Sequence, residues 1–366
     1  MKNRYIFLSL LVLSLLGMAP EAISQDMNYT QYFSTPIYYN PAYTGINSGV
    51  RARFLYRNQW PSLPVSYKSY FFSADLGDRN LPGSGGLGIM INQDTPGVGL
   101  INNFGAALTI GVRIPITSFM VTQIGVKAGI MQRKVNWDDM VFASQLDPKY
   151  GNIYTSTFIP PDANSRVVPD FGVGGVLQFI NPQGNVGGNI GFSVDHIFKP
   201  DVSFLSSGSS PYPRKWVGQF DLIIATGPGG SSMMSRGGGE EPLKINIGGI
   251  YQNQASLNSL QVGLNLLKYN VYVGGWFKST MTGVVNSALA LVAGYKYSFY
   301  EDMNIKFMYS YDLQISGALQ GTGGAHEISL ILEFDKLSIF GGGGGGFVPG
   351  GSGRRGGAPM ECPTFY

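Results

Sequence analysis

The chain has 366 residues, of which 52 are glycine, 21 are tyrosine and 22 are phenylalanine, while only 13% are charged. Soluble chains average about 25% charged residues and about 7% glycine, so this composition lacks the polar surface of a soluble protein of this length. The net charge of +3 comes from scattered basic residues, which excludes a nucleic-acid-binding surface. Cys362 is the only cysteine, so the chain can form neither an internal disulfide nor a thiolate metal cluster.

Residues 1–24 have the features of a secretory signal peptide. Lys2 and Arg4 precede an apolar run over 6–16, and 22–24 is a small-x-small cleavage site. The alternative, an N-terminal membrane anchor, is weaker because this run is too short to cross a bilayer. No later stretch reaches about 18 consecutive apolar residues, so we expect an exported protein with no membrane-spanning helix.

Apolar and polar residues alternate along most of the chain after residue 50. In 304–314, for example, the odd positions are apolar or aromatic, and all the even positions except Met308 are polar. This period of two is typical of strands with one apolar and one polar face. It predicts about fourteen strands, at 50–60, 66–77, 84–92, 102–114, 118–134, 168–180, 186–198, 214–226, 243–254, 258–267, 270–279, 286–298, 302–315 and 325–336.

The fold class that these strands predict is all-β, a transmembrane antiparallel β-barrel of outer-membrane type over residues 50–336. Unpaired strand edges are too costly in hydrocarbon, so the sheet must close, with its apolar face toward lipid. The competing architecture is a soluble sandwich or propeller. The charged residues expected to face the lumen are Arg51, Arg53, Arg57, Lys127, Asp195, Lys306 and Asp312.

The predicted connections alternate in length, as in outer-membrane barrels with short periplasmic turns and longer external loops. With a periplasmic N-terminus, the insertions at 135–167, 199–213 and 316–324 fall on the outer side. Two connections break this pattern, because 227–242 is long and periplasmic whereas 255–257 is short and external.

Two segments lie outside the predicted barrel. Residues 25–49 are rich in tyrosine and turn residues, and this segment could plug the lumen or lie along the periplasmic rim. Residues 337–366 form a glycine-rich, flexible tail with an apolar tip, which is either a docking element or a frayed end. The candidate docking residues of the tail are Arg354, Arg355, Cys362, Pro363 and Phe365.

The sequence predicts no catalytic site, no cofactor and no metal site. The chain has two histidines, His196 and His326, which lie 130 positions apart in the sequence, so the pattern predicts no zinc site. An outer-membrane lipid hydrolase is an alternative function, with His326, Glu327 and Ser329 as its candidate catalytic residues. It requires these three side chains to converge on one site.

Several short motifs resemble those of a known family in their order and spacing. They are Gln31-Tyr32, Tyr39-Asn40-Pro41-Ala42-Tyr43-Thr44-Gly45, Tyr56-Arg57-Asn58-Gln59-Trp60, Asp94 with Gly97, Tyr309-Ser310-Tyr311-Asp312, His326-Glu327-Ile328 and the ending Cys362-Pro363-Thr364-Phe365. On these motifs the chain resembles the PorP/SprF family of type IX secretion system outer-membrane proteins. The glycine-arginine tract at 341–357 and the insertion at 227–242 depart from the family pattern, which leaves the PorP-like or SprF-like subgroup open.

The resemblance implies a non-enzymatic barrel in a Bacteroidota-type outer membrane that assists secretion or surface attachment of cargo, including large gliding-related adhesins. The implied partners are outer-membrane lipid, periplasmic ring or peptidoglycan-binding components of the machine, and cargo with C-terminal sorting domains. We expect partner contacts from 25–49, the loops 135–167 and 199–213, and the tail. The alternative function is a passive porin or small-solute channel, which the arginines at 51, 53 and 57 would bias toward anions.

Overall fold

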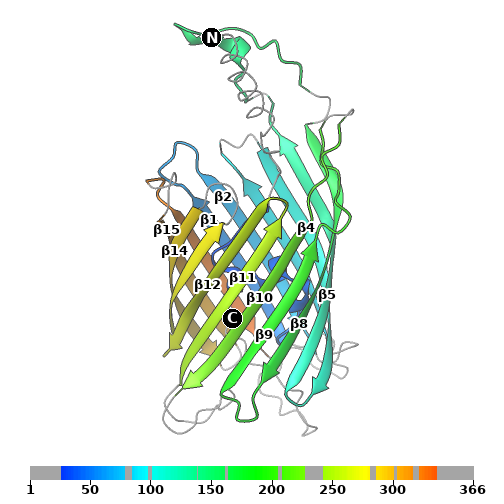
Figure 1. Cartoon of the computed structure of the whole chain (residues 1–366), viewed down its shortest axis with the longest axis vertical. Coiled ribbons are helices and arrows are strands. Elements are labelled where there is room, and N and C mark those ends of the chain that lie inside the picture. Colours follow the sequence, from blue (N-terminus) through cyan, green and yellow to red (C-terminus); the bar gives the residue numbers. More distant parts are fainter. Residues whose placement is uncertain are drawn as a thin grey trace, which may run out of the picture.

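Fourteen antiparallel strands form one closed barrel, in which each strand pairs with its neighbours along the chain and the last pairs with the first (Figure 1). This confirms the predicted transmembrane-type antiparallel barrel. The computed structural model describes residues 26–78, 85–97, 101–137, 139–160, 164–204, 208–226, 242–280, 286–300, 303–315 and 321–335. The predicted signal peptide (1–24) and the whole of the predicted tail (337–366) lie outside these residues.

The barrel strands are β1 (Gly49–Gln59), β2 (Tyr67–Gly77), β3 (Gly86–Thr95), β4 (Ile101–Thr117), β5 (Met120–Val135), β8 (Ser165–Ile180), β9 (Val186–Asp195), β10 (Lys215–Thr226), β11 (Leu243–Gln254), β12 (Leu257–Lys268), β13 (Val271–Thr280), β14 (Asn286–Tyr300), β15 (Met303–Gln314) and β16 (Ala325–Phe334). Burial alternates along them because side chains of a strand point to opposite faces. The outward face carries exposed Phe54, Ile110, Ile190 and Leu291, while the inward face carries buried charges. In the part of the chain that is described, no helix has the length and apolar character needed to cross a membrane.

The two ends of the barrel differ in their connections. We call the end at which β1 finishes the loop end, and the end at which β1 begins the turn end. The loop end carries the long connections β5–β8 and β9–β10, and the former projects beyond the rim (Figure 1). That connection also contains a turn, η4 (Ala143–Gln145), and a hairpin of β6 (Leu146–Asp147) and β7 (Gly151–Asn152), which the sequence did not predict.

Four predicted strands extend one to three residues past the observed ends, which are Gln59, Asp195, Gln314 and Phe334. Two of these ends are explained by the backbone. The strand expected to reach residue 198 ends at Asp195, because His196 has a positive φ of 54°. The strand expected to reach residue 60 ends at Gln59, because Trp60 has a φ of 58°. Neither angle is compatible with extended backbone, so the chain turns at these residues.

Residues 26–48, which we call the lumen segment, lie inside the barrel (blue in Figure 1). Three short helical turns shape it: η1 (Tyr32–Ser34), α2 (Pro36–Tyr39) and η2 (Pro41–Tyr43). Proline begins both α2 and η2, where its missing N–H is not needed. The Asn40 side chain accepts a hydrogen bond from the Ala42 N–H at 2.9 Å and so caps η2.

Candidate functional site

The lumen segment runs through the barrel from the loop end to the turn end. At the loop end, the Asp26 N–H donates to Gln254 Oε1 at 2.7 Å. Halfway along, the Tyr32 hydroxyl donates to Asp221 at 3.0 Å. Near the turn end, the Gly45 N–H donates to Asp75 at 2.9 Å. The side chains from residue 29 to residue 46 are buried, so this segment fills the lumen that the described strands enclose.

At the loop end, the first described residue of this segment is held by three side chains of the β9–β10 region. Asp26 Oδ2 lies 3.0 Å from His196 Nε2 and 3.2 Å from Lys215 Nζ. Asp26 Oδ1 accepts from the Tyr212 hydroxyl at 2.8 Å. We call this group of four residues the latch. It joins one carboxylate of the lumen segment to a strand and a loop of the wall.

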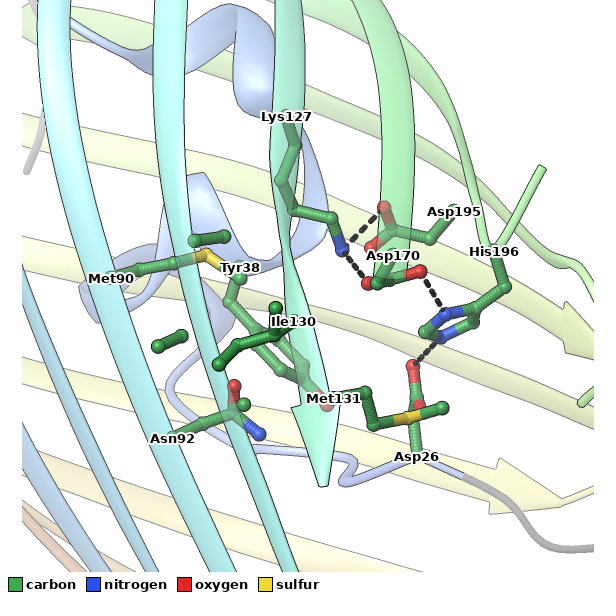
Figure 2. Close-up of a pocket in the computed structure, with 13 residues that line it drawn as sticks. Asp26, Tyr38, Met90, Asn92, Lys127, Ile130, Met131, Asp170, Asp195 and His196 are labelled. Atoms are coloured by element: carbon green, nitrogen blue, oxygen red, sulfur yellow. Dashed lines mark hydrogen bonds and ion pairs between the residues drawn. The ribbon is translucent and has the colours of Figure 1, made fainter. Parts of the chain in front are cut away.

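The latch continues into a chain of ion pairs along the wall (Figure 2). His196 Nδ1 lies 2.7 Å from Asp170 on β8, and Lys127 on β5 bridges Asp170 and Asp195 at 2.9 and 2.6 Å. A cavity of about 40 Å³ lies between these side chains and Tyr38. Each buried charge has an opposite partner, which is the condition under which buried charges are tolerated.

These contacts shift the pKa values of the two latch residues that lie outside the strands. Burial alone would lower the pKa of His196, but the facing carboxylates of Asp26 and Asp170 outweigh it and raise the pKa to about 9. Burial alone would raise the pKa of Asp26, but Lys215 and His196 outweigh it and hold the pKa well below its usual range. The latch is therefore an ion pair at neutral pH.

A second cluster holds the lumen segment at the seam between the first and last strands. Arg57 on β1 pairs with Glu327 on β16, and it lies 3.1 Å from Asp312 on β15. Lys278 on β13 lies 3.1 Å from the same Asp312 oxygen. Thr30 completes this seam cluster: its hydroxyl accepts from Arg57 and Lys278 and donates to Asp312 at 2.8 Å.

The Asn40–Gly45 motif fits against glycines of the wall. A Cβ added to Gly125 on β5 would collide with the backbone of Pro41 and Ala42, and one added to Gly174 on β8 would collide with Asn40 Oδ1. Gly45 has a φ of +64° and lies against the backbone of β2 and β3, where a side chain would not fit. These strand glycines therefore mark close approach of the lumen segment.

The remaining lumen-facing charges of the sequence prediction are buried and paired. Arg53 pairs with Asp75. Glu333 lies 2.9 Å from Lys306 and 3.5 Å from Arg51 near the turn end.

Other motif residues lie in the wall or at its rim. Asp94 is buried and accepts from the hydroxyls of Tyr67 and Ser69. Gln59 accepts from Arg57 at 3.2 Å. The remaining three lie at turns or on the outer face. The backbone N–H of Trp60 donates to the Gly324 carbonyl, Gly97 has a φ of 74°, and the Tyr56 ring packs against the Tyr70 ring.

The residues considered for a hydrolase do not come together. Tyr309 and His326 lie on the outer side of β15 and β16, where the Tyr309 hydroxyl is 2.7 Å from His326 Nδ1. Glu327 and Ser329 point into the lumen and bind the lumen segment instead. Because His326 and Ser329 lie on opposite faces of β16, this grouping cannot form a catalytic triad. Among the described residues, no group of histidine, cysteine or carboxylate side chains is suited to hold a metal ion.

Sequence reasoning missed the partners of the predicted charges. Asp26, Asp75, Asp170, Lys215, Lys278 and Glu333 complete the ion pairs of the lumen. One usable signal is that adjacent predicted strands carry opposite inward charges at matching positions, as with Arg51 on β1 opposite Glu333 on β16. The tail residues Arg354, Arg355, Cys362, Pro363 and Phe365 lie outside the described residues.

Comparison with known proteins identifies the family. A family model described as type IX secretion system membrane protein PorP/SprF matches residues 22–332. No curated protein sequence matches the chain significantly. Similar solved structures include CdiB from Acinetobacter baumannii (11% identity, 78% of this chain, 60% of that chain, TM-score 0.43). A Pseudomonas aeruginosa FadL homologue is also similar, with 10% identity over 81% of this chain and 92% of that chain and a TM-score of 0.43. The CymD monoaromatic hydrocarbon channel has 9% identity over 85% of this chain and 93% of that chain and a TM-score of 0.40.

The match covers less than two thirds of the length of CdiB, and at these identities the likeness concerns the barrel fold alone. The family match, in contrast, spans most of the sequence. Together with the closed barrel and its apolar outer face, it places the protein in the outer membrane. The chain belongs to the PorP/SprF family of type IX secretion system membrane proteins.

Proposed function

We propose that this protein assists secretion or surface attachment of type IX cargo as an interaction partner, with its lumen closed by residues 26–48. The observation that carries this proposal is the burial of that segment in the ion-pair network of the wall. A passive porin needs a continuous aqueous lumen. The arginines that would make such a pore favour anions instead have carboxylate partners: Arg51 with Glu333, Arg53 with Asp75, and Arg57 with Glu327.

The expected partner contacts follow from what the barrel leaves exposed. Residues 26–48 are no longer a candidate docking surface, because nearly all of them are buried in the lumen. The β5–β8 connection exposes Tyr150, Tyr154 and Ile159 at the loop end, which we take as the cell-surface end because external loops are longer. β16 finishes at the turn end, which is the periplasmic end in this orientation, and residues 337–366 follow β16 in the sequence.

In this proposal, residues 1–24 direct export, the loop end meets cargo with C-terminal sorting domains, and the tail meets periplasmic ring or peptidoglycan-binding components. Large gliding-related adhesins of a Bacteroidota-type envelope are the cargo class that the family resemblance favours.

The test is co-purification from the native outer membrane, comparing the full chain with a chain that lacks residues 341–366. We expect periplasmic secretion components to co-purify with the full chain and to be lost with the shortened one, while cargo is retained by both. A matched variant, in which Tyr150 and Tyr154 are replaced by serine, should lose cargo and retain the periplasmic components. Recovery of neither class with the full chain, or of both classes with every variant, would overturn the proposal.

A further inference from the structure

A groove of about 360 Å³ lies in the outer wall across the seam of the barrel, over β16, β1, β2 and β3. Its outward-facing side chains form two parallel rows of four, set by the strand register. One row consists of Ile328, Tyr56, Tyr70 and Gln93, and the other of Leu330, Phe54, Phe72 and Ile91. The volume is within the range of about 300–1,000 Å³ found for small-molecule sites.

The two rows differ in chemistry. The row of Leu330, Phe54, Phe72 and Ile91 is wholly apolar and lies near the middle of β1. The other row lies two residues closer to the loop end and carries two phenol hydroxyls and the Gln93 amide. The groove therefore changes from apolar to polar in the direction of the loop end.

Two aromatic pairs line the groove. The rings of Phe54 and Phe72 are 4.7 Å apart, and those of Tyr56 and Tyr70 are 5.1 Å apart. Phe54 and Tyr70 are 45% and 48% exposed, so the rings remain open to the surroundings. Gln93 is also exposed, although an amide facing hydrocarbon without a partner is costly.

We propose that this groove binds one membrane phospholipid, with an acyl chain along the phenylalanine row and the ester region at Tyr56, Tyr70 and Gln93. The groove is continuous with the lipid-facing surface of the barrel, so lipid is the molecule that meets it. An acyl chain matches the apolar row. The ester oxygens of the same lipid accept hydrogen bonds from the tyrosine hydroxyls and the glutamine amide, which satisfies polar groups that hydrocarbon alone would leave unpaired.

The test uses dioleoylphosphatidylethanolamine, titrated into the full-length mature protein in detergent micelles and followed by native mass spectrometry. Ile91→Trp fills the groove, and Ile190→Trp places the same bulk on β9, where Ile190 also faces outward. We expect one strongly retained lipid on the wild type and on Ile190→Trp, and about tenfold or more loss of the retained lipid on Ile91→Trp.

A second variant keeps the shape of the groove and removes its polar groups. The double change Tyr70→Phe with Gln93→Leu should lower lipid retention several-fold while the barrel still migrates as a folded, heat-modifiable band. This variant decides the matter if Ile91→Trp does not fold. Equal retention by the wild type and the double variant, or a wild type that retains no lipid at all, would overturn the proposal.

Discussion

Arg57 on the first strand forms an ion pair with Glu327 on the last strand, and both side chains are almost fully buried. The same Glu327 carboxylate accepts the backbone N–H groups of Thr30 and Gln31, at 2.7 and 2.8 Å. One carboxylate therefore binds both the seam that closes the barrel and the segment that fills it. Closure of the sheet and occupation of the lumen are energetically coupled at this point.

Glu327→Gln should destabilise the folded barrel and weaken the hold on the lumen segment. The change leaves Arg57 buried with one partner fewer, and breaking such a pair costs about 3 kcal/mol or more. Urea unfolding in lipid vesicles measures this loss, and planar-bilayer recordings should show openings that the wild type lacks. Glu333→Gln is the matched control, because Glu333 pairs with Arg51 and Lys306 rather than with the lumen segment. Openings of equal frequency in both variants would contradict the prediction.

A disulfide should form between the lumen segment and the wall in Ser34→Cys with Ser329→Cys. The two hydroxyl oxygens are 3.2 Å apart in the buried seam region, a spacing that suits a cystine after small adjustments. The background carries Cys362→Ser, so that no other thiol is present. Mild oxidant should give a faster-migrating band in non-reducing electrophoresis, and the single variants should not. Absence of the cross-link in folded protein would show that residues 26–48 do not occupy the lumen in the membrane.

The fold could be predicted from the sequence because a strand that faces lipid on one side and the lumen on the other must alternate apolar and polar side chains. Alternation in 304–314 and 325–336 places every second side chain in hydrocarbon, and the structure has β15 and β16 there. A predicted strand end was wrong where one residue has backbone angles outside the extended region, as His196 does. The positive φ of a non-glycine residue is fixed by its tertiary contacts, which the alternation pattern does not reveal.

The latch could not be predicted, because it depends on contacts between residues far apart in the chain. Asp26 and His196 are 170 positions apart, and they meet only once the lumen segment has been placed inside the closed barrel. Short turns such as η1 and η2 have no periodicity. The sequence therefore could not decide whether residues 25–49 plug the lumen or lie along the periplasmic rim. The inward charges were visible, but their partners depend on strand register and on the path of this segment.

Gly125→Val should expel the lumen segment or prevent it from docking. A side chain at this position meets the backbone of Pro41 and Ala42, which cannot move away as the end of a side chain can. Overpacking of this kind costs about 1–3 kcal/mol. Proteinase K should then cleave within 26–48 of the variant in detergent, whereas the wild type stays intact. Gly275→Val on β13 is the control, since its Cβ would meet no atom within 4 Å. Equal resistance of both variants to the protease would count against close packing at Gly125.

The latch should weaken as the pH rises from about 6.5 to above 9. The pKa of His196 is about 9 in the folded protein and about 6.5 in an unfolded chain, so protonation stabilises the fold fully below pH 6.5, and this contribution is lost as the pH passes 9. The lowered pKa of Asp26 acts in the other direction, because its contribution is lost only on acidification below about pH 4. Urea midpoints at pH 6 and pH 9.5 should therefore differ for the wild type by the equivalent of about 3 kcal/mol. His196→Gln, which cannot be protonated in this range, should start less stable at pH 6 and change much less. If the variant and the wild type respond to pH equally, the charge on His196 does not hold Asp26 in place.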